Sequence, residues 1–442
     1  MQSRGLSRRR FLQGMALSVT GATLAACAMP AAPGGTGSSA SPEETEIVWH
    51  HRLGGYAVYG ERIAAFEEAN PGVKVVVEEF PQGSAEYGPK IVSLIAAGIV
   101  GDMTWTALGS GSYQFLMQNN GLAPLDDLIE ADASGFSLDE YYPNIIESLR
   151  FNGSVFGLPE LAHGVNTCLF FNRDAIEAEG LEAPTMDWTH EQLAEMAVAM
   201  TNADRHGFLP ATGDYSNTRN QTLPYGGELL SEDGTTSLIT SEEAKTGLRW
   251  VYDLFYGVQV APTPSMVLGV DGGTNQMFLS GRLASFQSGG WSLSIDEVVG
   301  DEFVWDMVLM PAGPSGSRGG HLHIDAEAIT EQSENKQLAY ELCKYLTDKE
   351  GAVGVALETG LACRPDVYED ARISDNPYVV LLGQANSEAA PHINPANLRK
   401  QEMQTTVRAI FDPLWVGDVE PTDEFFEQAS ATYQEFLDKS AD

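Results

Sequence analysis

The spacing of apolar residues divides the chain into short strands and helices from residue 46 onward. Glu46–Trp49 is a short apolar strand, and Val58–Ala69 has the pattern of a helix. Asn70–Gly72, an NPG sequence, breaks the chain before a second apolar strand, Val73–Val77. A strand, a helix and a strand within about thirty residues form a βαβ unit, so these strands are predicted to be parallel.

The alternation of strands and helices continues toward the C-terminus with different residues. A helix is predicted near Tyr87–Ala97, and a strand over Thr167–Phe171. Alternating elements of this kind are typical of an α/β protein with a parallel sheet. We therefore assign the α/β class.

Two polar pairs mark the starts of further helices. Thr189 and Gln192 have the spacing of a capping box, and the helix that they open is predicted to end near Met200. Thr240 and Glu243 have the same spacing and predict a second helix, which ends near residue 255. Both helices fit the α/β pattern.

The N-terminus has the features of an export signal. Ser7–Gln13, SRRRFLQ, carries the twin-arginine pattern, and the apolar stretch that follows it is too short to span a bilayer comfortably. Leu24–Cys27 resembles a bacterial lipobox, which would make Cys27 the lipidated first residue of the mature protein. A cleaved signal without lipid is the alternative. We expect residues 1–26 to be removed, 27–43 to form a flexible tether, and the protein to sit at the outer face of the cytoplasmic membrane.

The charge balance restricts the partners. The chain has 62 acidic and 25 basic residues and a formal net charge of −37. Nucleic acid and anionic bilayers would repel it, so we expect no nucleic-acid partner and contact with the membrane only through the N-terminal lipid. The acids are dispersed, and no second long apolar run follows the leader. The mature body is therefore expected to be soluble.

Three cysteines follow Cys27, namely Cys168, Cys343 and Cys363. They have no metal-binding spacing, and residues of this kind usually pack in the core. A disulfide between Cys343 and Cys363 remains the alternative for an exported protein.

Aromatic and planar polar side chains are plentiful in the predicted loops. Sugars are recognised by flat aromatic faces against C–H-rich ring surfaces, together with polar groups that hydrogen-bond hydroxyls. Trp291 follows Gly289 and Gly290, so its indole is expected to be presented and not buried. The other candidates are Tyr56, Tyr59, Trp105, Asp214 and Tyr215, with Arg52, Glu160, His163, Asn217, Arg219 and Arg364 beside them. We assign the remaining tryptophans to packing, namely Trp49, Trp188, Trp250 and Trp305.

The sequence gives less support to a metal site or to an enzyme than to sugar binding. His50-His51, His163 and the pair His321 and His323 are potential zinc ligands, but they are far apart in sequence and no Cys or Glu completes a known spacing. No metal site and no cofactor is assigned. With so many acids, a glycosidase-like pair is always available and indicates nothing. No nucleophile-elbow, zinc-protease or P-loop motif occurs, so we expect no enzyme.

The order of several short motifs resembles one family. Asn70–Val75 resembles the family's opening, and Asn152–Pro159 its G-x-x-Y-G-L-P element. Leu169–Asp174 resembles L-x-Y-N-K-D, and Met277–Trp291 resembles F-x-x-G-x-A-A-M…G-x-W. In this order they are similar to the family 1 extracellular solute-binding proteins of bacterial ABC sugar importers, the group that includes maltose-binding protein.

The resemblance implies a type II periplasmic-binding-protein fold, with two α/β lobes, a ligand cleft between them and three hinge crossings. The crossings would fall near 162–166, 320–322 and 361–366. The N-terminal lobe would comprise 44–162 and 322–364, and the C-terminal lobe 165–319 and 365–442.

The resemblance also implies a function. It implies that a mono- or oligosaccharide is captured between the lobes, with Trp291 stacked on the sugar, and is delivered to the membrane permease of an ABC importer. It also implies a monomer, the default of the family. The contact residues carried over are His51, Arg52, Glu160, His163 and Arg364. Glycerol phosphate or another polar solute, held by Arg52 and Arg364, is an alternative. A metal-binding protein is another, and so is a sensor that lacks a permease.

Overall fold

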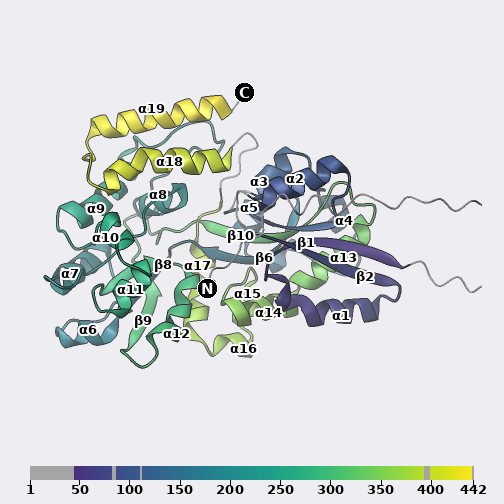
Figure 1. Ribbon diagram of the computed structural model, residues 1–442, viewed down its shortest axis with the longest axis horizontal. Helices are drawn as coiled ribbons and strands as arrows, with labels where there is room; N and C mark the ends of the chain where they lie inside the picture. Colours follow the sequence, from purple (N-terminus) through teal and green to yellow (C-terminus); the bar gives the residue numbers. More distant parts are fainter. Residues whose placement is uncertain (1–43, 82–85, 110–111, 393–398, 441–442) are drawn as a thin grey trace, which may run out of the picture. The chain divides into compact units, whose positions relative to one another are not determined.

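The computed structural model describes residues 44–81, 86–109, 112–392 and 399–440. The N-terminal part of the chain contributes most strands of a five-stranded sheet. The strand order is β2 (Val73–Phe80), β1 (Thr45–Arg52), β3 (Met103–Ala107), β10 (Leu322–Ile329) and β6 (Gly157–Gly164). β1 is parallel to both neighbours, which confirms the predicted βαβ unit. β10 returns from far along the chain and lies antiparallel between β3 and β6 (Figure 1).

A second sheet has three antiparallel strands in the order β8 (Ser285–Ser288), β7 (Cys168–Asn172) and β9 (Trp305–Leu309). Phe170 in the central strand stacks on Phe286 of β8, with ring centroids 5.2 Å apart. On the other side it stacks on Trp305 of β9, at 5.9 Å. Three rings in a row thus hold the strands in register.

Helices cover both sheets. The first half of the chain contributes η1 (Tyr56–Tyr59), α1 (Gly60–Ala69), α2 (Tyr87–Ala97), α3 (Ser112–Gln118), α4 (Asp126–Glu130), η2 (Leu138–Glu140), α5 (Pro143–Leu149), the short strands β4 (Arg150–Phe151) and β5 (Ser154–Val155), α6 (Arg173–Ala178), α7 (His190–Met200), α8 (Tyr215–Thr222) and η3 (Leu223–Tyr225). The second half contributes α9 (Glu242–Tyr256), α10 (Pro264–Leu268), α11 (Gly273–Leu279), η4 (Gly290–Ser294), α12 (Ile295–Val299), α13 (Lys336–Thr347), α14 (Lys349–Thr359), α15 (Pro365–Tyr368), α16 (Ala371–Ser374), α17 (Pro377–Glu388), α18 (Lys400–Trp415) and α19 (Asp423–Ser440). α13 and α14 pack on β6, whereas α17 contacts both β6 and β9.

The predicted helix starts are confirmed in one case and shifted in the other. Thr189 and Gln192 form the predicted capping box at the start of α7. At α9 the cap is Ser241 and not Thr240, because the Ser241 hydroxyl accepts the hydrogen bond of the Ala244 backbone N–H. The prediction was therefore wrong by one residue.

The core contains the residues that were assigned to packing. Trp49 and Trp305 are buried, and Trp188 and Trp250 are half-buried against apolar neighbours. The three described cysteines are buried and unbridged, so the expectation of core thiols holds and the disulfide alternative does not.

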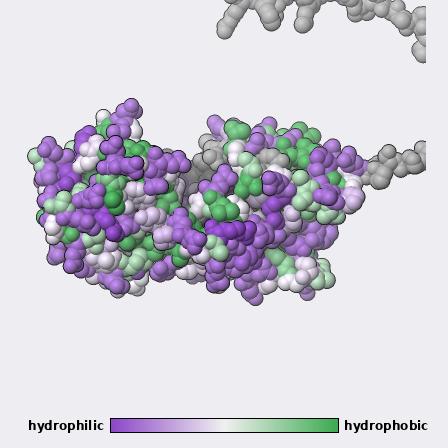
Figure 2. Space-filling model, turned by 90° about the horizontal axis from the view of Figure 1, so that it is seen from below, coloured by the Kyte–Doolittle hydropathy of each residue, from purple (hydrophilic) through white to green (hydrophobic). Residues whose placement is uncertain are grey.

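The outer surface is mainly polar on the face drawn in Figure 2, where apolar side chains occur in small groups. Among the described helices, none combines the length and the apolar composition that crossing a membrane requires. The predicted leader, Cys27 and the tether lie outside the described residues.

Candidate ligand-binding site

A cavity of about 980 Å³ is lined by residues of both sheets. β6 and β10 contribute His163 and His323, and β8 contributes Phe286, Gln287 and Ser288. The size lies at the upper end of the range of small-molecule sites, roughly 300–1,000 Å³. Two separate walls therefore meet around a space that is large enough for a solute.

Trp291 lies on the wall of this cavity and is 47% exposed. Its indole lies against the backbone of Gly289, where a Cβ atom would come within 2.1 Å of the ring carbon Cζ3. A Cβ on Gly290 would lie 2.8 Å from Leu382 Cδ1. A side chain at either glycine would meet a close neighbour, and at Gly289 that neighbour is the indole itself.

His163 stands beside this indole. Its ring meets Trp291 edge-on at a centroid distance of 5.2 Å and stacks on His323 at 4.8 Å. Burial, and secondarily the neighbouring His323, lowers the pKa of His163 to about 3. The imidazole is therefore neutral at physiological pH, and its Nδ1 atom has no hydrogen-bond partner in the structure.

Planar amides form another part of the lining. The Gln287 side chain donates to the Asn166 carbonyl oxygen at 2.8 Å and accepts from the Gln221 amide at 2.8 Å. Asn166 has a positive φ of 53°, which asparagine tolerates better than most residues. Asp214 also lines the cavity and caps α8 by accepting from the Asn217 backbone N–H at 3.0 Å. These groups are already oriented by the fold.

Other predicted ligand residues lie outside the cavity lining. Trp105 and Tyr215, expected in loops, lie in β3 and α8 and are each only 3% exposed, because both pack within apolar clusters. Arg364 is buried in ion pairs with Glu140 and Asp366. For Tyr56 the structure describes the backbone, in η1, but not the side chain.

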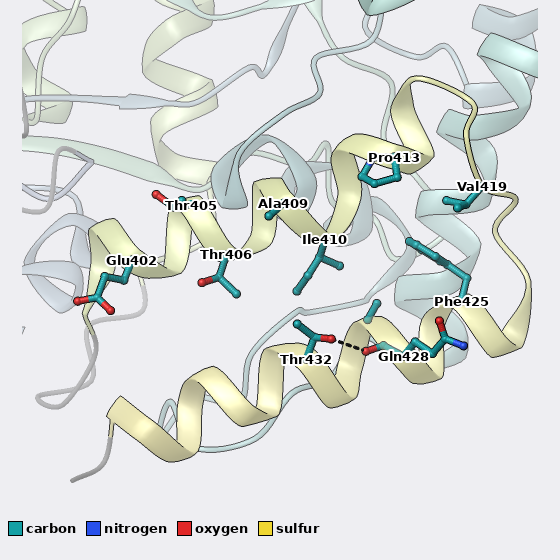
Figure 3. Close-up of a pocket in the computed structure, with 11 residues that line it drawn as sticks. Glu402, Thr405, Thr406, Ala409, Ile410, Pro413, Val419, Phe425, Gln428 and Thr432 are labelled. Carbon is teal, nitrogen blue, oxygen red and sulfur yellow. Dashed lines mark hydrogen bonds between the residues drawn. The ribbon is translucent and has the colours of Figure 1, made fainter.

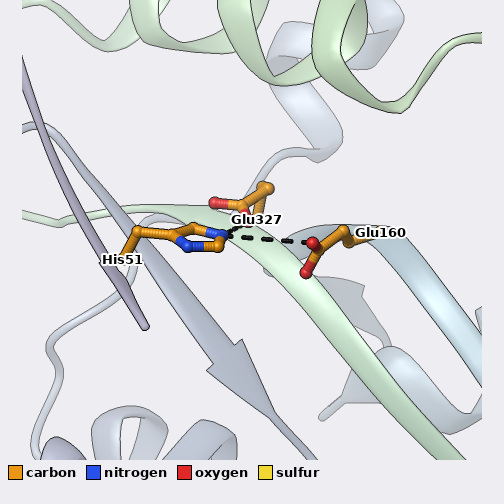
Figure 4. A group of neighbouring side chains, drawn as sticks. All are labelled: His51, Glu160 and Glu327. Atoms are coloured by element: carbon orange, nitrogen blue, oxygen red, sulfur yellow. Dashed lines mark ion pairs between the residues drawn. The ribbon is translucent and has the colours of Figure 1, made fainter. Parts of the chain in front are cut away.

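His51, Arg52 and Glu160 come together with Glu327 in a buried cluster of the five-stranded sheet. His51 Nε2 lies 3.3 Å from Glu327 Oε1 and 4.0 Å from Glu160 Oε1 (Figure 4). Arg52 donates to both oxygens of Glu160, at 3.1 Å each, and also pairs with Asp325.

Burial and neighbouring charges act in opposite directions on this cluster. Burial raises the pKa of Glu160, against the opposite effects of Arg52 and His51. Burial lowers the pKa of His51, but the Glu327 and Glu160 carboxylates raise it by more, so the net shift is upward.

A second cavity, of about 800 Å³, lies between α18 and α19 (Figure 3). Its lining comes from these two helices and Val419 between them, and Phe425 is its one aromatic ring. None of the predicted ligand residues belongs to it. The cavity with Trp291 is therefore the better candidate for a polar solute.

The sequence pattern of bacterial extracellular solute-binding proteins matches residues 61–379. The chain belongs to this family. A binding protein of Brucella abortus (strain 2308) is 22% identical over 294 residues, which cover 65% of this chain and 67% of that protein.

Solved structures share the fold of this solute-binding protein. An ABC substrate-binding protein of Listeria monocytogenes in complex with cycloalternan has a TM-score of 0.72 and 20% identity, over 89% of this chain and 99% of that one. The cyclic α-maltosyl-1,6-maltose binding protein of Arthrobacter globiformis has a TM-score of 0.75 and 16% identity, over 90% and 100%. Maltose-bound MalE3 of T. maritima has a TM-score of 0.69 and 22% identity, over 89% and 99%. The fold is thus the α/β, two-lobed periplasmic-binding-protein fold of type II.

Four polar residues of this solute-binding protein were not predicted from the sequence, although they lie in the cavity lining or in the buried cluster. Gln287 and Asn166 are amides in otherwise ordinary segments, and nothing local distinguishes them. Asp325 and Glu327 had a usable signal, since they are two acids at alternate positions of the apolar strand β10. Such acids are rarely buried without partners.

Proposed function

We propose that this protein binds a mono- or oligosaccharide in the cavity beside Trp291 and delivers it to the permease of an ABC importer. The observation that carries the proposal is the half-exposed indole, held on the backbone of Gly289 at the wall of a cavity of about 980 Å³. An aromatic face so placed can stack on the C–H face of a sugar ring.

Neighbouring polar groups suit hydroxyls. The neutral His163 ring, the Asp214 carboxylate and the Gln287 amide all line the same cavity. Together they offer hydrogen-bond donors and acceptors, and one of the three is a carboxylate. Structural neighbours bound to cycloalternan or maltose support the same class of ligand.

We assign the predicted site residues to two roles. Trp291, His163 and Asp214 would touch the sugar. His51, Arg52, Glu160, Trp105, Tyr215 and Arg364 would hold the surrounding walls, because they are largely buried. Tyr56 is left as a potential contact.

Binding would proceed by closure of the lobes, with ligand favouring the closed state. We propose crossings near 162–166, 320–322 and 361–366, between lobes of 44–162 with 322–364 and 165–319 with 365–442. Positive φ angles at Asn166, Gly319 and Gly320, of 53°, 76° and 83°, support the first two.

Delivery to a permease fits an anchored, monomeric protein. We propose that residues 1–26 direct export, that Cys27 carries the lipid, and that 27–43 tether the body at the outer face of the membrane.

A phosphate ligand is less well supported than a sugar, because Arg52 and Arg364 are both paired with carboxylates and neither lines the cavity.

The deciding experiment is a thermal-shift screen of the purified protein against mono-, di- and oligosaccharides, cyclic and linear, and glycerol phosphates, followed by calorimetry on each hit. A ligand of the folded state raises the melting temperature with its concentration relative to its dissociation constant. We expect a sugar hit that Trp291→Ala abolishes and that Trp291→Phe partly retains.

Val298→Ala is the matched control, because Val298 is an exposed apolar residue of nearby α12 that does not line the cavity. It should bind like the unaltered protein. A screen in which no sugar shifts the melting temperature would contradict the proposal.

A further inference from the structure

We propose that His51, Glu160 and Glu327 form a resident site for one divalent transition-metal ion of the zinc class, in the five-stranded sheet. One ligand atom from each residue lies within 4.8 Å of the other two, and all three residues are buried. The three come from β1, β6 and β10, so an ion would join three strands.

The distances are close to those that zinc needs. Bonds of about 2.1 Å in a tetrahedral site place ligand atoms about 3.4 Å apart. The His51 Nε2 and Glu327 Oε1 atoms are 3.3 Å apart, and the His51 Nε2 and Glu160 Oε1 atoms are 4.0 Å apart. Only a small movement of Glu160 would complete three corners, and water can supply the fourth.

His51 and Glu327 are each oriented by a partner on the far side, and Glu160 is held through both of its oxygens. The His51 Nδ1–H donates to the Arg52 carbonyl oxygen at 3.2 Å, which leaves the Nε2 lone pair facing the carboxylates. Trp49 Nε1–H donates to Glu327 Oε2 at 2.6 Å, so Oε1 is the oxygen that faces His51. Arg52 holds Glu160. Outer partners of this kind are typical of metal ligands.

Two of the facing atoms have little beyond each other. His51 Nε2 and Glu327 Oε1 form an ion pair at 3.3 Å, neither side chain has any exposed surface, and neither atom has a hydrogen bond to any other group in the structure. Buried polar atoms are rarely left in this state. A cation between them would satisfy both at once.

The charge of the surroundings favours a cation. Glu160, Glu327 and Asp325 place three carboxylates near Arg52, which pairs with Glu160 and Asp325. Isolated carboxylates are costly to bury unless they are paired or bind a metal. A mixed nitrogen and oxygen set suits zinc and its neighbours better than magnesium or calcium.

A small cavity reaches one of the three ligands, Glu160. This separate cavity of about 250 Å³ is lined by Arg52, Glu160 and the exposed Glu358. Gly54 and Gly55 also line this small cavity. A cation could therefore reach Glu160 without passing through the cavity that contains Trp291, so metal and sugar would occupy separate places.

The test begins with the purified full chain. Elemental analysis gives the metal content as isolated. After chelation and dialysis, Zn²⁺ and Co²⁺ are titrated back while the melting temperature and the visible absorption of Co²⁺ are followed. We expect one ion per chain, a saturable rise in melting temperature and a tetrahedral Co²⁺ spectrum.

Glu327→Gln and His51→Gln should each weaken Zn²⁺ binding by about 100-fold or more and abolish the Co²⁺ spectrum. Glu78→Gln is the matched control, because Glu78 is also a glutamate beside a histidine, His50, at 3.3 Å, but is half-exposed. It should leave the spectrum unchanged.

The proposal is overturned if the unaltered chain binds neither ion saturably, in which case a proton occupies the space between His51 and Glu327. It is equally overturned if both variants keep the Co²⁺ spectrum, since the ion would then lie elsewhere. If the variants do not fold, the metal titration of the unaltered chain alone decides whether the proposal holds. Sugar binding is measured independently and need not fail with it.

Discussion

His163 and His323 face each other across the paired strands β6 and β10, and their rings stack at a centroid distance of 4.8 Å. Trp291, which follows β8 of the other sheet, meets His163 edge-on at 5.2 Å. The contact joins the two walls of the cavity. A sugar that stacks on the indole would therefore also lie beside a neutral imidazole.

The burial of His163 predicts a pH dependence of stability. Its pKa is about 3 in the folded protein and about 6.5 in an unfolded chain. The unfolded state therefore binds more protons, and the stability that His163 contributes is complete above about pH 6.5 and is lost as the pH falls toward about 3. His163→Asn should reduce the loss of unfolding free energy between pH 7 and pH 5 by about 2 kcal/mol. Urea denaturation at the two pH values measures this, and equal losses in both proteins would contradict it.

Gly289→Ala should disturb the indole more than the fold. The added Cβ would lie 2.1 Å from Trp291 Cζ3, so the ring must move. We expect sugar binding to weaken by about tenfold, or ~1.4 kcal/mol, with a change in tryptophan fluorescence. Gly60→Ala is the control, because a Cβ there meets nothing within 4 Å. Unchanged affinity in Gly289→Ala would show that the indole position is not important for binding.

Trp49→Phe should destabilise the protein by about 1–3 kcal/mol, because it removes the N–H donor from a buried carboxylate, Glu327. Trp188→Phe should cost less, since Trp188 is half-buried and packs on apolar residues. Chemical denaturation compares the two. Equal costs would mean that ring volume, and not the hydrogen bond, determines the effect.

Ser241→Ala should lower the unfolding free energy by about 1 kcal/mol through loss of the α9 cap. Thr240→Ala, one residue earlier, should have little effect. The same denaturation experiment distinguishes the two positions, and a larger loss at Thr240 would restore the start that the sequence predicted.

Arg364→Gln should reduce stability by about 2 kcal/mol, because it removes charged hydrogen bonds to Glu140 and Asp366. Sugar affinity should remain within about twofold of the unaltered value, since Arg364 does not line the cavity. Calorimetry with the sugar found in the screen measures the affinity. A large loss of affinity with unchanged stability would make Arg364 a ligand contact.

Local features of the chain were predictable because they depend on neighbours in the sequence. The βαβ unit, the capping box at Thr189 and the bounds of α2 follow from apolar spacing and from backbone groups that nearby side chains satisfy. The presentation of Trp291 followed from the two glycines before it. The order of short motifs was sufficient to indicate the family.

The tertiary structure decided which distant residues meet. β10 lies between β3 and β6 although more than 150 residues separate it from β6 in the chain, and only this arrangement brings Glu327 to His51. Local patterns cannot show it, because they fix which way a side chain points along its own strand but not which strand lies beside it. The sequence by itself thus determined the first βαβ unit, the positions of several helices, the family and the exposed indole. The fold determined which polar residues line the cavity and which are buried, because burial and pairing depend on neighbours that are distant in the chain.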